Sequence, residues 1–543
     1  MKAEERVPPS SLQKALAWIL EPRQLLALNL IGSLAAFVLL GTYEYLRWRD
    51  FDLGIDYAIQ NQGTFLIAHG HLAPRDTIYG GGFDNNALTY LFIVIGLVRT
   101  LVPTGVMLLV LQALAVAATY LFIMQIVIRV TRRLPLGWRG AVVIGSALLT
   151  FLNPWALEAV SFDVHGEPFG ALGLVVLLYG MLRSQRTYFY AGLALALLSG
   201  AGTLIVLAGL SVGLLATKST RRWGIRTTIG VVIIGIIALL TGDSGSSFSS
   251  LYGYLASSSG ATPGATAILR SIVEHPTRPV SVLVSRWPEI RELIGYAGII
   301  GLAWPPTLVA AVAAVVANGL PQNSAFLSLT QGFQNWPVEA VLVAGGAIVV
   351  SRLAGAHHAN HDALSEGDRA NGRSRWRLLG GRAIVALWTA VSVAIGIGAL
   401  STDLGIPRSW FNQPYASVSA LRVAQRSIPR DAEVVATINA IARVSARAQL
   451  FQQIAPTQAQ PVCAAVVDVL IEVPGPYAVL TSQEASHDVR TLLRAPGHTV
   501  LQQSGVVLVQ FGGLHPGREA LIVPTGQVVT GPQAASLDAS QCQ

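Results

Sequence analysis

Charged residues are scarce in this chain. Only 12% of its 543 residues are Asp, Glu, Lys or Arg, whereas a soluble domain carries about 25%. Hydrophobic residues make up 52% of the sequence instead, and the mean hydropathy is positive. The composition therefore excludes an ordinary soluble enzyme. It predicts an α-helical polytopic membrane protein surrounded by a lipid bilayer.

Several sequence motifs are missing as well. The chain has only two cysteines, Cys463 and Cys542, and no CxxC pair or Cys/His cluster that would indicate zinc. It has no P-loop, Rossmann fingerprint, GxSxG or usable HExxH. Lys and Arg exceed Asp and Glu by eight, but no basic patch interleaved with aromatic residues points to nucleic acid. These absences argue against an ATP-driven pump, the standard hydrolases and nucleic-acid binding.

Hydrophobic segments separated by basic loops predict the topology. Residues 1–23 form a polar cytoplasmic N-terminus, and residues 24–43 form an uncleaved signal anchor. Loops rich in Lys or Arg then mark the cytoplasmic side, which predicts about eleven spans within the transmembrane domain at residues 24–401. This alternation gives three outer loops: 44–103, 154–167 and 242–292.

Two apolar stretches do not fit simple spans. Residues 88–98 are too short to cross a bilayer, which takes about 20 residues, and they predict an interfacial helix. Residues 188–217 are flanked by basic residues at both ends, so both ends are expected on the cytoplasmic side. Two short helices that turn near Ser199-Gly200-Ala201-Gly202 would satisfy this, because broken helices are tolerated inside a bundle.

The tail at residues 402–543 differs in character. It has no spanning segment, and β-rich runs at 464–471 and 506–511 alternate with helix-like stretches. We expect a small extracytoplasmic α/β domain. Both cysteines lie in it, in a compartment that permits disulfides, which favours a Cys463–Cys542 bond over two free thiols.

Two acidic motifs are predicted to face the same side. Asp52 and Asp56 follow the first span, and Asp163, His165 and Glu167 follow the third. A carboxylate at the membrane surface can act as a general base. Arginine suits a phosphate because its planar fork is permanently charged. The third outer loop supplies Arg270, Arg278 and Arg286 as candidates for that role, while contact with lipid headgroups stays open as the alternative for each of them.

The motif Asp163-x-His165-x-Glu167 raises the question of a metal. Alternate spacing places all three side chains on one face only in an extended strand, and a helix or turn would spread them. We therefore assign no metal ligands and predict no firmly bound cofactor, while a divalent metal stays open.

Several motifs together resemble a known family. They are Phe51-Asp52-Leu53-Gly54-Ile55, Ala68-His69-Gly70, Asn153-Pro154, the 162–168 stretch and the Gln331-to-Pro337 segment. Their order is similar to that of an uncharacterised bacterial family of polytopic membrane proteins. The layout of that family resembles GT-C glycosyltransferases through most of the chain.

The resemblance implies an activity and a site. The donor would be a sugar on a polyprenyl phosphate, the acceptor a cell-envelope glycan or glycolipid, and the active site extracytoplasmic on the bacterial plasma membrane. An acid of the first outer loop would be the general base, which is Asp52 here, with Asp56 as runner-up. Asp163, His165 and Glu167 would lie near the same cavity.

Two departures from the family keep other functions open. A histidine-bearing motif is replaced by Phe83-Asp84-Asn85-Asn86, and a Lys-Glu-Asp-like stretch by Ser199-Gly200-Ala201-Gly202-Thr203. A non-catalytic envelope-assembly scaffold of the same fold is therefore one alternative, and a lipid or solute transporter is another. Transporters place ionisable residues near the bilayer midplane, often between repeats, whereas here the acids lie at segment ends and no repeat is evident.

Overall fold

The computed structural model describes most of the chain. The described residues are 17–78, 81–83, 89–241, 251–256, 265–322, 324–328, 332–363, 383, 386–398, 415–453, 457–473, 482–531, 534 and 542. Residues Asp84-Asn85-Asn86, Gln331 and most of the basic linker at 352–382 lie outside them, as does most of the N-terminal segment 1–23.

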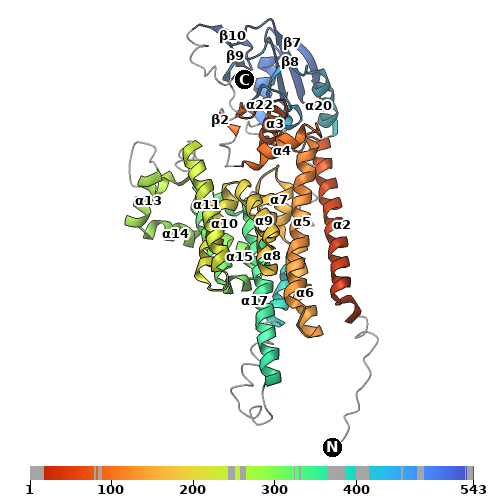
Figure 1. Cartoon of the computed structure of the whole chain (residues 1–543). Helices are drawn as coiled ribbons and strands as arrows, with labels where there is room; N and C mark the ends of the chain where they lie inside the picture. The colour runs from red at the N-terminus through yellow and green to blue at the C-terminus, as the bar shows by residue number, and fades with distance from the viewer. Residues whose placement is uncertain are drawn as a thin grey trace, which may run out of the picture.

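Five long helices form the body of the molecule (Figure 1). They are α2 (Pro22–Arg49), α5 (Val106–Thr131), α6 (Leu136–Phe151), α8 (Glu167–Arg183) and α17 (Trp336–Ala363). α2 packs on α5, and both α5 and α8 pack on α17. The side chains between them are mostly apolar, and Trp155, Trp336 and Tyr120 are buried in this core. Close packing of this kind holds helices together where lipid removes the usual hydrophobic driving force.

Further helices surround this body. They are α3 (Ile55–Ala68), α4 (Leu91–Arg99), α7 (Pro154–Ser161), α9 (Arg186–Leu198), α10 (Ala201–Ala216), α11 (Arg221–Thr241), α13 (Ala265–Glu274), α14 (Thr277–Ser285), α15 (Trp287–Tyr296) and α16 (Pro305–Gly319). Four 3₁₀ turns join them: η2 (Gly253–Leu255), η3 (Ile300–Ala303), η4 (Ser324–Leu327) and η5 (Phe333–Asn335). A strand pair, β1 (Arg75–Asp76) and β2 (Gly81–Gly82), follows α3.

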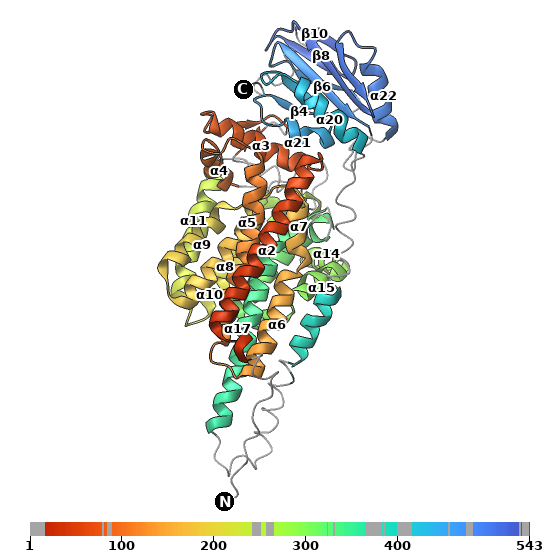
Figure 2. The same ribbon diagram turned by 90° about the vertical axis from the view of Figure 1, so that its right-hand side faces the viewer.

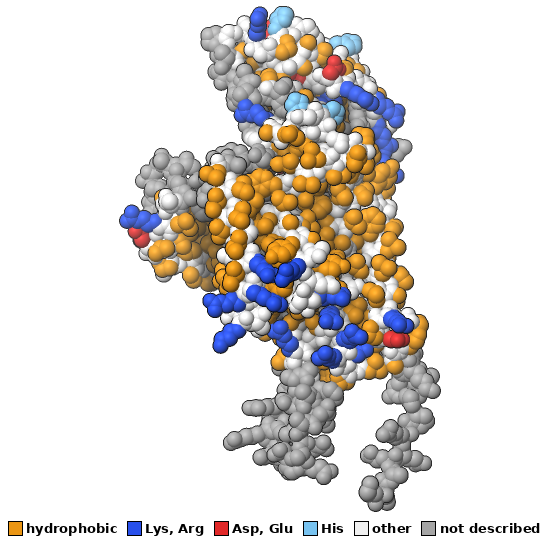
Figure 3. All heavy atoms as spheres, in the orientation of Figure 1, with side chains coloured by type: hydrophobic (Ala, Val, Ile, Leu, Met, Phe, Trp, Pro, Cys, Tyr) orange, Lys and Arg blue, Asp and Glu red, His pale blue; other side chains and the backbone are white. Residues whose placement is uncertain are grey.

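Among the described residues, four segments are long and apolar enough to cross a membrane: Pro22–Arg49, Val106–Thr131, Leu136–Ser161 and Phe333–Ala354. Three shorter apolar helices accompany them: Ala201–Ala216, Pro305–Gly319 and Ala386–Gly398. Figure 3 shows hydrophobic side chains over the middle of the bundle, and Lys and Arg gathered toward the end nearest the N-terminus. A helical membrane protein is thus confirmed, while the count of about eleven spans stays a prediction.

The expected break in the 188–217 segment is present. α9 ends at Leu198 and α10 begins at Ala201, with Gly200 at φ +112° between them. Positive φ is readily adopted only by glycine. α9 packs against α8 so closely that a Cβ at Gly173 would lie 2.6 Å from the backbone nitrogen of Ala196. The two short helices predicted there are therefore observed, and glycine permits their close approach.

The C-terminal domain, defined here as the described residues from 415 onward, is an α/β unit. Its main sheet has the order β4-β3-β6-β8-β7, in which β3 pairs in parallel with β4 and β6 while β8 is antiparallel to both neighbours. A second sheet has the order β10-β9-β5. The strands are β3 (Glu433–Ala436), β4 (Leu450–Gln452), β5 (Gln458–Pro461), β6 (Val466–Glu472), β7 (His498–Gln503), β8 (Val506–Gly512), β9 (Glu519–Val523) and β10 (Gln527–Thr530). The helices are α20 (Tyr415–Ser427), α21 (Ile438–Val444) and α22 (Ser482–Leu492).

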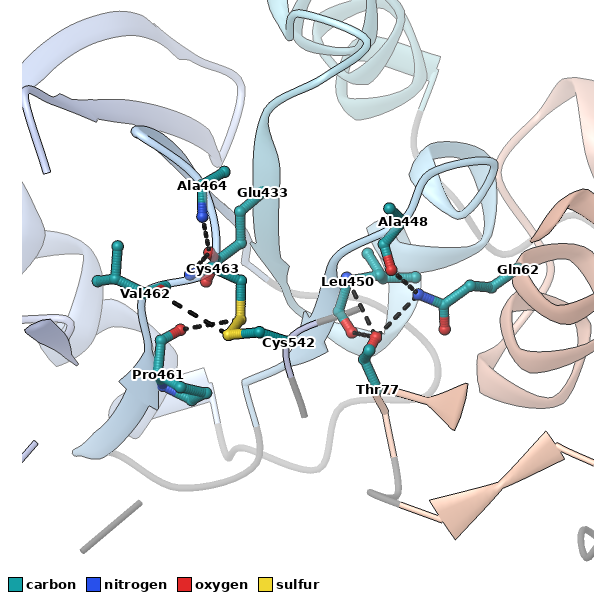
Figure 4. Close-up of a disulfide and its surroundings, with 10 residues drawn as sticks. All are labelled: Gln62, Thr77, Glu433, Ala448, Leu450, Pro461, Val462, Cys463, Ala464 and Cys542. Carbon is teal, nitrogen blue, oxygen red and sulfur yellow. Dashed lines mark hydrogen bonds between the residues drawn. A yellow bond between two sulfur atoms is a disulfide. The ribbon is translucent and has the colours of Figure 1, made fainter. Parts of the chain in front are cut away.

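Two predictions for the tail are confirmed. The β-rich runs at 464–471 and 506–511 correspond to β6 and β8. Cys463 and Cys542 form a disulfide (Figure 4). Beside it, the buried carboxylate of Glu433 accepts hydrogen bonds from the backbone nitrogens of Cys463 (2.6 Å) and Ala464 (3.1 Å). The loop that carries the disulfide is thus held against the first strand of the sheet.

The C-terminal domain is docked on α3 at one end of the bundle (Figure 2). Tyr57 and Phe92 of the membrane part share one hydrophobic core with Ile441 and Leu450 of the domain. Polar contacts cross the interface as well: Gln62 donates to the carbonyl of Ala448 (2.9 Å), and the backbone nitrogen of Leu450 donates to Thr77 Oγ1 (3.2 Å; Figure 4). The shared core and these hydrogen bonds make the docking of the domain a fixed contact.

Candidate active site

The site begins where α2 ends. The amide of Asp52 donates to the carbonyl of Arg47 (2.9 Å), and that of Phe51 to Trp48 (3.4 Å). These two bonds define a Schellman turn, in which the residue after the C-cap is left-handed and is usually glycine. Here it is Phe51, at φ +61°, a conformation that costs a residue with a Cβ about 1–2 kcal/mol. The turn brings Asp52 back to Arg47, with 3.3 Å between Oδ2 and Nε.

Asp163 joins the two acidic loops. Its carboxylate accepts hydrogen bonds from the backbone nitrogens of Gly54 (2.9 Å), Asp56 (3.1 Å) and Tyr57 (3.3 Å), at the start of α3. These amides have no partner within the helix, and a carboxylate there also interacts favourably with the helix dipole. Arg47 lies 3.9 Å away on the other side. Asp163 thus serves as a cap for α3 supplied from a distant part of the chain.

Close packing against Asp163 explains why the first motif has a glycine at position 54. A Cβ at Gly54 would lie 2.8 Å from Oδ2 of Asp163, too close for ordinary contact. Gly54 therefore admits the carboxylate that caps α3. The Phe51-Asp52-Leu53-Gly54-Ile55 motif and the 162–168 stretch, which sequence analysis treated as two motifs, form one structural unit.

Asp56 and His165 form the accessible part of the site. His165 Nε2 lies 3.6 Å from Asp56 Oδ2, and the Asp56 side chain is 31% exposed, compared with 4% for Asp52. The imidazole of His165 stacks on Phe333, with 3.6 Å between ring centroids. The stacking and the backbone amide of His165, which donates to Gln112 Oε1 (3.0 Å), fix the imidazole beside Asp56.

The pKa values of these groups differ from their ordinary values. Loss of hydration raises the pKa of Asp52 to about 6, although Arg47 opposes the shift. It raises the pKa of Asp56 to about 7, and the negative charge of Asp163 adds to this. Burial lowers the pKa of His165 to about 3, so its imidazole is neutral. A carboxylate with a pKa near neutrality is suited to general-base catalysis.

Not all predicted residues lie in this cluster. Glu167 begins α8 with its carboxylate directed toward the helix break, since a Cβ at Gly202 would lie 3.2 Å from its Oε1. Arg270 is exposed and pairs with Glu274 (2.7 Å). The other two arginines bond to backbone carbonyls, Arg278 to Leu255 and Arg286 to Gly319.

The structure does not bring these arginines to the acidic turn. α14 lies at the side of the bundle away from α3 in both views (Figures 1 and 2), and α13 lies beside α14 in Figure 1. The prediction that these arginines and the acids face the same side of the membrane does not fix the distance between them in the membrane plane, because intervening spans can separate two loops widely. The three arginines are therefore placed apart from Asp52 and Asp56.

Sequence reasoning missed three contributors. Gln112 of α5 donates to Glu44 of α2 (2.7 Å), and both are fully buried. Phe333 supplies the stacking surface for His165. Polar residues inside apolar spans are themselves a signal, because they are costly in a bilayer, and both Glu44 and Gln112 carried it. For Phe333 the only signal in the sequence was the resemblance of its segment to the family.

Metal ligands do not converge in the described part of the chain, where no group of three or more His, Cys, Asp or Glu could hold an ion. In the Asp163-x-His165-x-Glu167 motif the three side chains are spread among a helix cap, an aromatic stack and the helix break.

These features define a polytopic helical membrane protein with an acidic site beneath a docked α/β domain. A family model described as "Predicted membrane protein (DUF2079)" matches residues 47–488, and the chain belongs to this family. Among curated proteins, no match was found. A solved structure, "Crystal Structure of ArnT from Cupriavidus metallidurans bound to Undecaprenyl phosphate", aligns with 87% of this chain and 97% of its own, at 12% identity and a TM-score of 0.45. At that TM-score the likeness supports no argument about function, which is developed below from the residues.

Proposed function

We propose that this protein is a membrane glycosyltransferase that moves a sugar from a polyprenyl-phosphate donor to a cell-envelope glycan or glycolipid. The observation that carries the proposal is the convergence of two acidic loops on Asp56, a partly exposed carboxylate with a pKa near 7 beside a neutral histidine. The family resemblance of the same motifs supplies the class of donor and acceptor.

The proposed arrangement in the membrane follows from charge and redox chemistry. Basic loops gather at the end of the bundle opposite the C-terminal domain (Figure 3), as is usual for the cytoplasmic side. The Cys463–Cys542 disulfide suits an oxidising compartment. We therefore place residues 1–23 in the cytoplasm, a GT-C-like transmembrane domain of about eleven spans at 24–401, and residues 402–543 outside the plasma membrane of a bacterium.

The geometry favours Asp56 over Asp52 as the base. Asp52 is 3% exposed and paired with Arg47, whereas Asp56 can reach an acceptor. In the proposed step the acceptor oxygen attacks the anomeric carbon and its proton passes to the Asp56 carboxylate. The bond from that carbon to the donor phosphate breaks, and its electron pair leaves with the polyprenyl phosphate. Arg47 and Asp163 hold the backbone that presents Asp56.

Complementation of a deletion strain tests the proposal. Asp56→Asn is expected to abolish restoration of the missing glycan and to cause the polyprenyl-phosphate sugar to accumulate, at protein levels equal to wild type. Asp50→Asn is the control, because Asp50 lies in the same turn but pairs with Arg49 and Arg422 near the surface. Full restoration by Asp56→Asn would remove Asp56 as the base.

A scaffold is the second candidate. The observation in its favour is the Ser199-to-Thr203 stretch, where the family resemblance predicts charged residues and this chain has none. The stretch adjoins Glu167 through Gly202, so any missing charge would have been near the second acidic loop. Under this hypothesis Asp56→Asn and Asp52→Asn restore the envelope as well as wild type does, while deletion of the chain does not.

A further inference from the structure

The C-terminal domain touches the acidic turn through one side chain. The guanidinium of Arg443 lies 3.7 Å from the ring centroid of Trp48 and 4.8 Å from that of Phe51. Its Nη1 donates to the carbonyl of Trp48 (2.8 Å). A cation held over two aromatic rings in a desolvated setting is a favourable contact. Arg443 therefore contacts the backbone and both rings of the turn that ends α2.

Arg443 is itself fixed within the C-terminal domain. Its Nη2 donates to Oε1 of Gln425 (3.0 Å), and Nε2 of Gln425 donates back to the carbonyl of Arg443 (2.9 Å). Gln425 belongs to α20 and Arg443 to α21. Two helices of the domain thus fix the orientation of the guanidinium that contacts the turn. Its position therefore follows the position of the domain.

The turn depends on support from outside. Phe51 adopts a left-handed conformation that residues with a Cβ avoid, yet its side chain is 1% exposed. Strained backbone of this kind persists only where the surroundings determine it. The same turn directs Asp52 onto Arg47, which also approaches Asp163. Whatever holds Trp48 and Phe51 therefore also holds the ion pair behind the site.

We propose that Arg443 is a positioning residue through which the docked C-terminal domain keeps the Trp48–Asp52 turn in place, so that Asp52 stays on Arg47. It does not touch the reacting atoms. The inference that this affects catalysis rests on the proposed function, whereas the positioning itself does not.

Arg422 provides a matched control. It belongs to the same domain and reaches the same turn, but it bonds the carboxylate of Asp50 (3.0 Å) and the carbonyl of Arg49 (3.2 Å). These contacts lie near the surface, where ion pairs have little effect, and neither involves the rings of Trp48 and Phe51. Arg422→Ala removes the same charge from the same interface without removing the support.

The experiment measures the protonation of Asp52 in the full chain, purified in lipid nanodiscs. A hydrophobic carbodiimide labels protonated buried carboxyls, and peptide mass spectrometry follows labelling of Asp52 from pH 4 to about 9. Arg47 lowers the pKa of Asp52 while the pair is intact, since an opposite charge within a few ångströms favours the ionised form by about 1–3 pH units. Loss of the pair in Arg443→Ala is therefore expected to move the labelling midpoint upward by about that amount.

Two further variants make the result decisive. Arg422→Ala should leave the midpoint unchanged, and Arg443→Lys should shift it partway, because lysine keeps the charge but lacks the planar fork that stacks and donates. If Arg443→Ala does not yield folded protein, Arg443→Lys against Arg422→Ala carries the comparison. Equal midpoints in the Arg443 and Arg422 variants would overturn the inference.

The two proposals can fail separately. If Arg443 substitution shifts the Asp52 midpoint but Asp56→Asn restores the envelope fully, the positioning role stands and the transferase does not. If Asp56→Asn is inactive while substitution of Arg443 leaves the midpoint of Asp52 labelling unchanged, the transferase stands and the positioning role is rejected.

Discussion

Removal of the Asp163 carboxylate should loosen the start of α3 without unfolding the helix bundle. Asp163 accepts three backbone hydrogen bonds, from Gly54, Asp56 and Tyr57, across a separation of more than 100 residues. α3 has no side-chain cap of its own, since its N-cap position is Gly54. Without Asp163 these amides have no acceptor in a region where water is largely excluded.

The magnitude follows from the kind of bond lost. A hydrogen bond to a charged group contributes about 1.5–3 kcal/mol, and loss of an N-cap alone costs about 1 kcal/mol. The three bonds share one carboxylate and are not additive, so we expect Asp163→Ala to cost about 2–4 kcal/mol of local stability. Each 1.4 kcal/mol is a factor of ten, which corresponds to exchange of these amides faster by about 30- to 700-fold. Asp163→Asn should show a smaller effect, because one oxygen acceptor remains.

Hydrogen–deuterium exchange read by mass spectrometry on the peptide covering residues 53–60 tests this. Asp50→Asn is the control, because its surface pairs contribute at most about 1 kcal/mol. Exchange in Asp163→Ala that matches Asp50→Asn would refute the argument that the carboxylate caps α3. Faster exchange spread equally over α5 and α17 would also refute it, since the expected effect is local.

Three further predictions concern the proposed chemistry and the fold. If Asp56 is the base, its raised pKa of about 7 means that transfer rises with pH, is half-maximal near pH 7 and falls about tenfold per unit below that; a pH–rate profile with no inflection there contradicts it. Substitution of Cys463 or Cys542 by serine removes a cross-link between residues 79 apart and should lower the free energy of unfolding of the C-terminal domain by about 2–4 kcal/mol. Hydrogen–deuterium exchange followed against temperature should then show the strands of this domain melting at a lower temperature. An unchanged melting profile would argue against the prediction. Gly173→Val should reduce the yield of folded protein, since overpacking costs about 1–3 kcal/mol, whereas Gly235→Val, where nothing lies within 4 Å, should not; equal yields sink the packing argument.

Much of the helical layout could be predicted because its signals are local. The basic residues at both ends of 188–217 implied a pair of short helices, and α9 and α10 are that pair. The boundaries were less accurate. The first span was expected at residues 24–43, whereas α2 runs from Pro22 to Arg49, because polar and charged residues can continue a helix past the apolar stretch.

The site could be predicted only in outline. The sequence indicated that the acids after the first and third spans share one side, and the structure brings Asp52, Asp56, Asp163 and His165 together. The sequence could not indicate that Asp163 caps α3 or that Arg443 supports the turn, because partners so far apart in the chain leave no local pattern. The wrong expectation that Arg270, Arg278 and Arg286 lie near the acids has a related cause. That they share one outer loop does not indicate where their helices lie around the bundle.

The capping of α3 has a consequence for how the protein is made. The first loop emerges early in synthesis, but its helix cap arrives with Asp163, and Gln62 meets Ala448 only 386 residues later. At about 5–20 residues per second, that delay lasts roughly 20 to 80 seconds. The amides at the start of α3 stay uncapped until Asp163 is synthesised, and the face of α3 that meets the C-terminal domain stays unpaired throughout the longer delay. The first part of the site to be translated is therefore among the last to be completed, and a chain truncated before residue 448 leaves it unfinished.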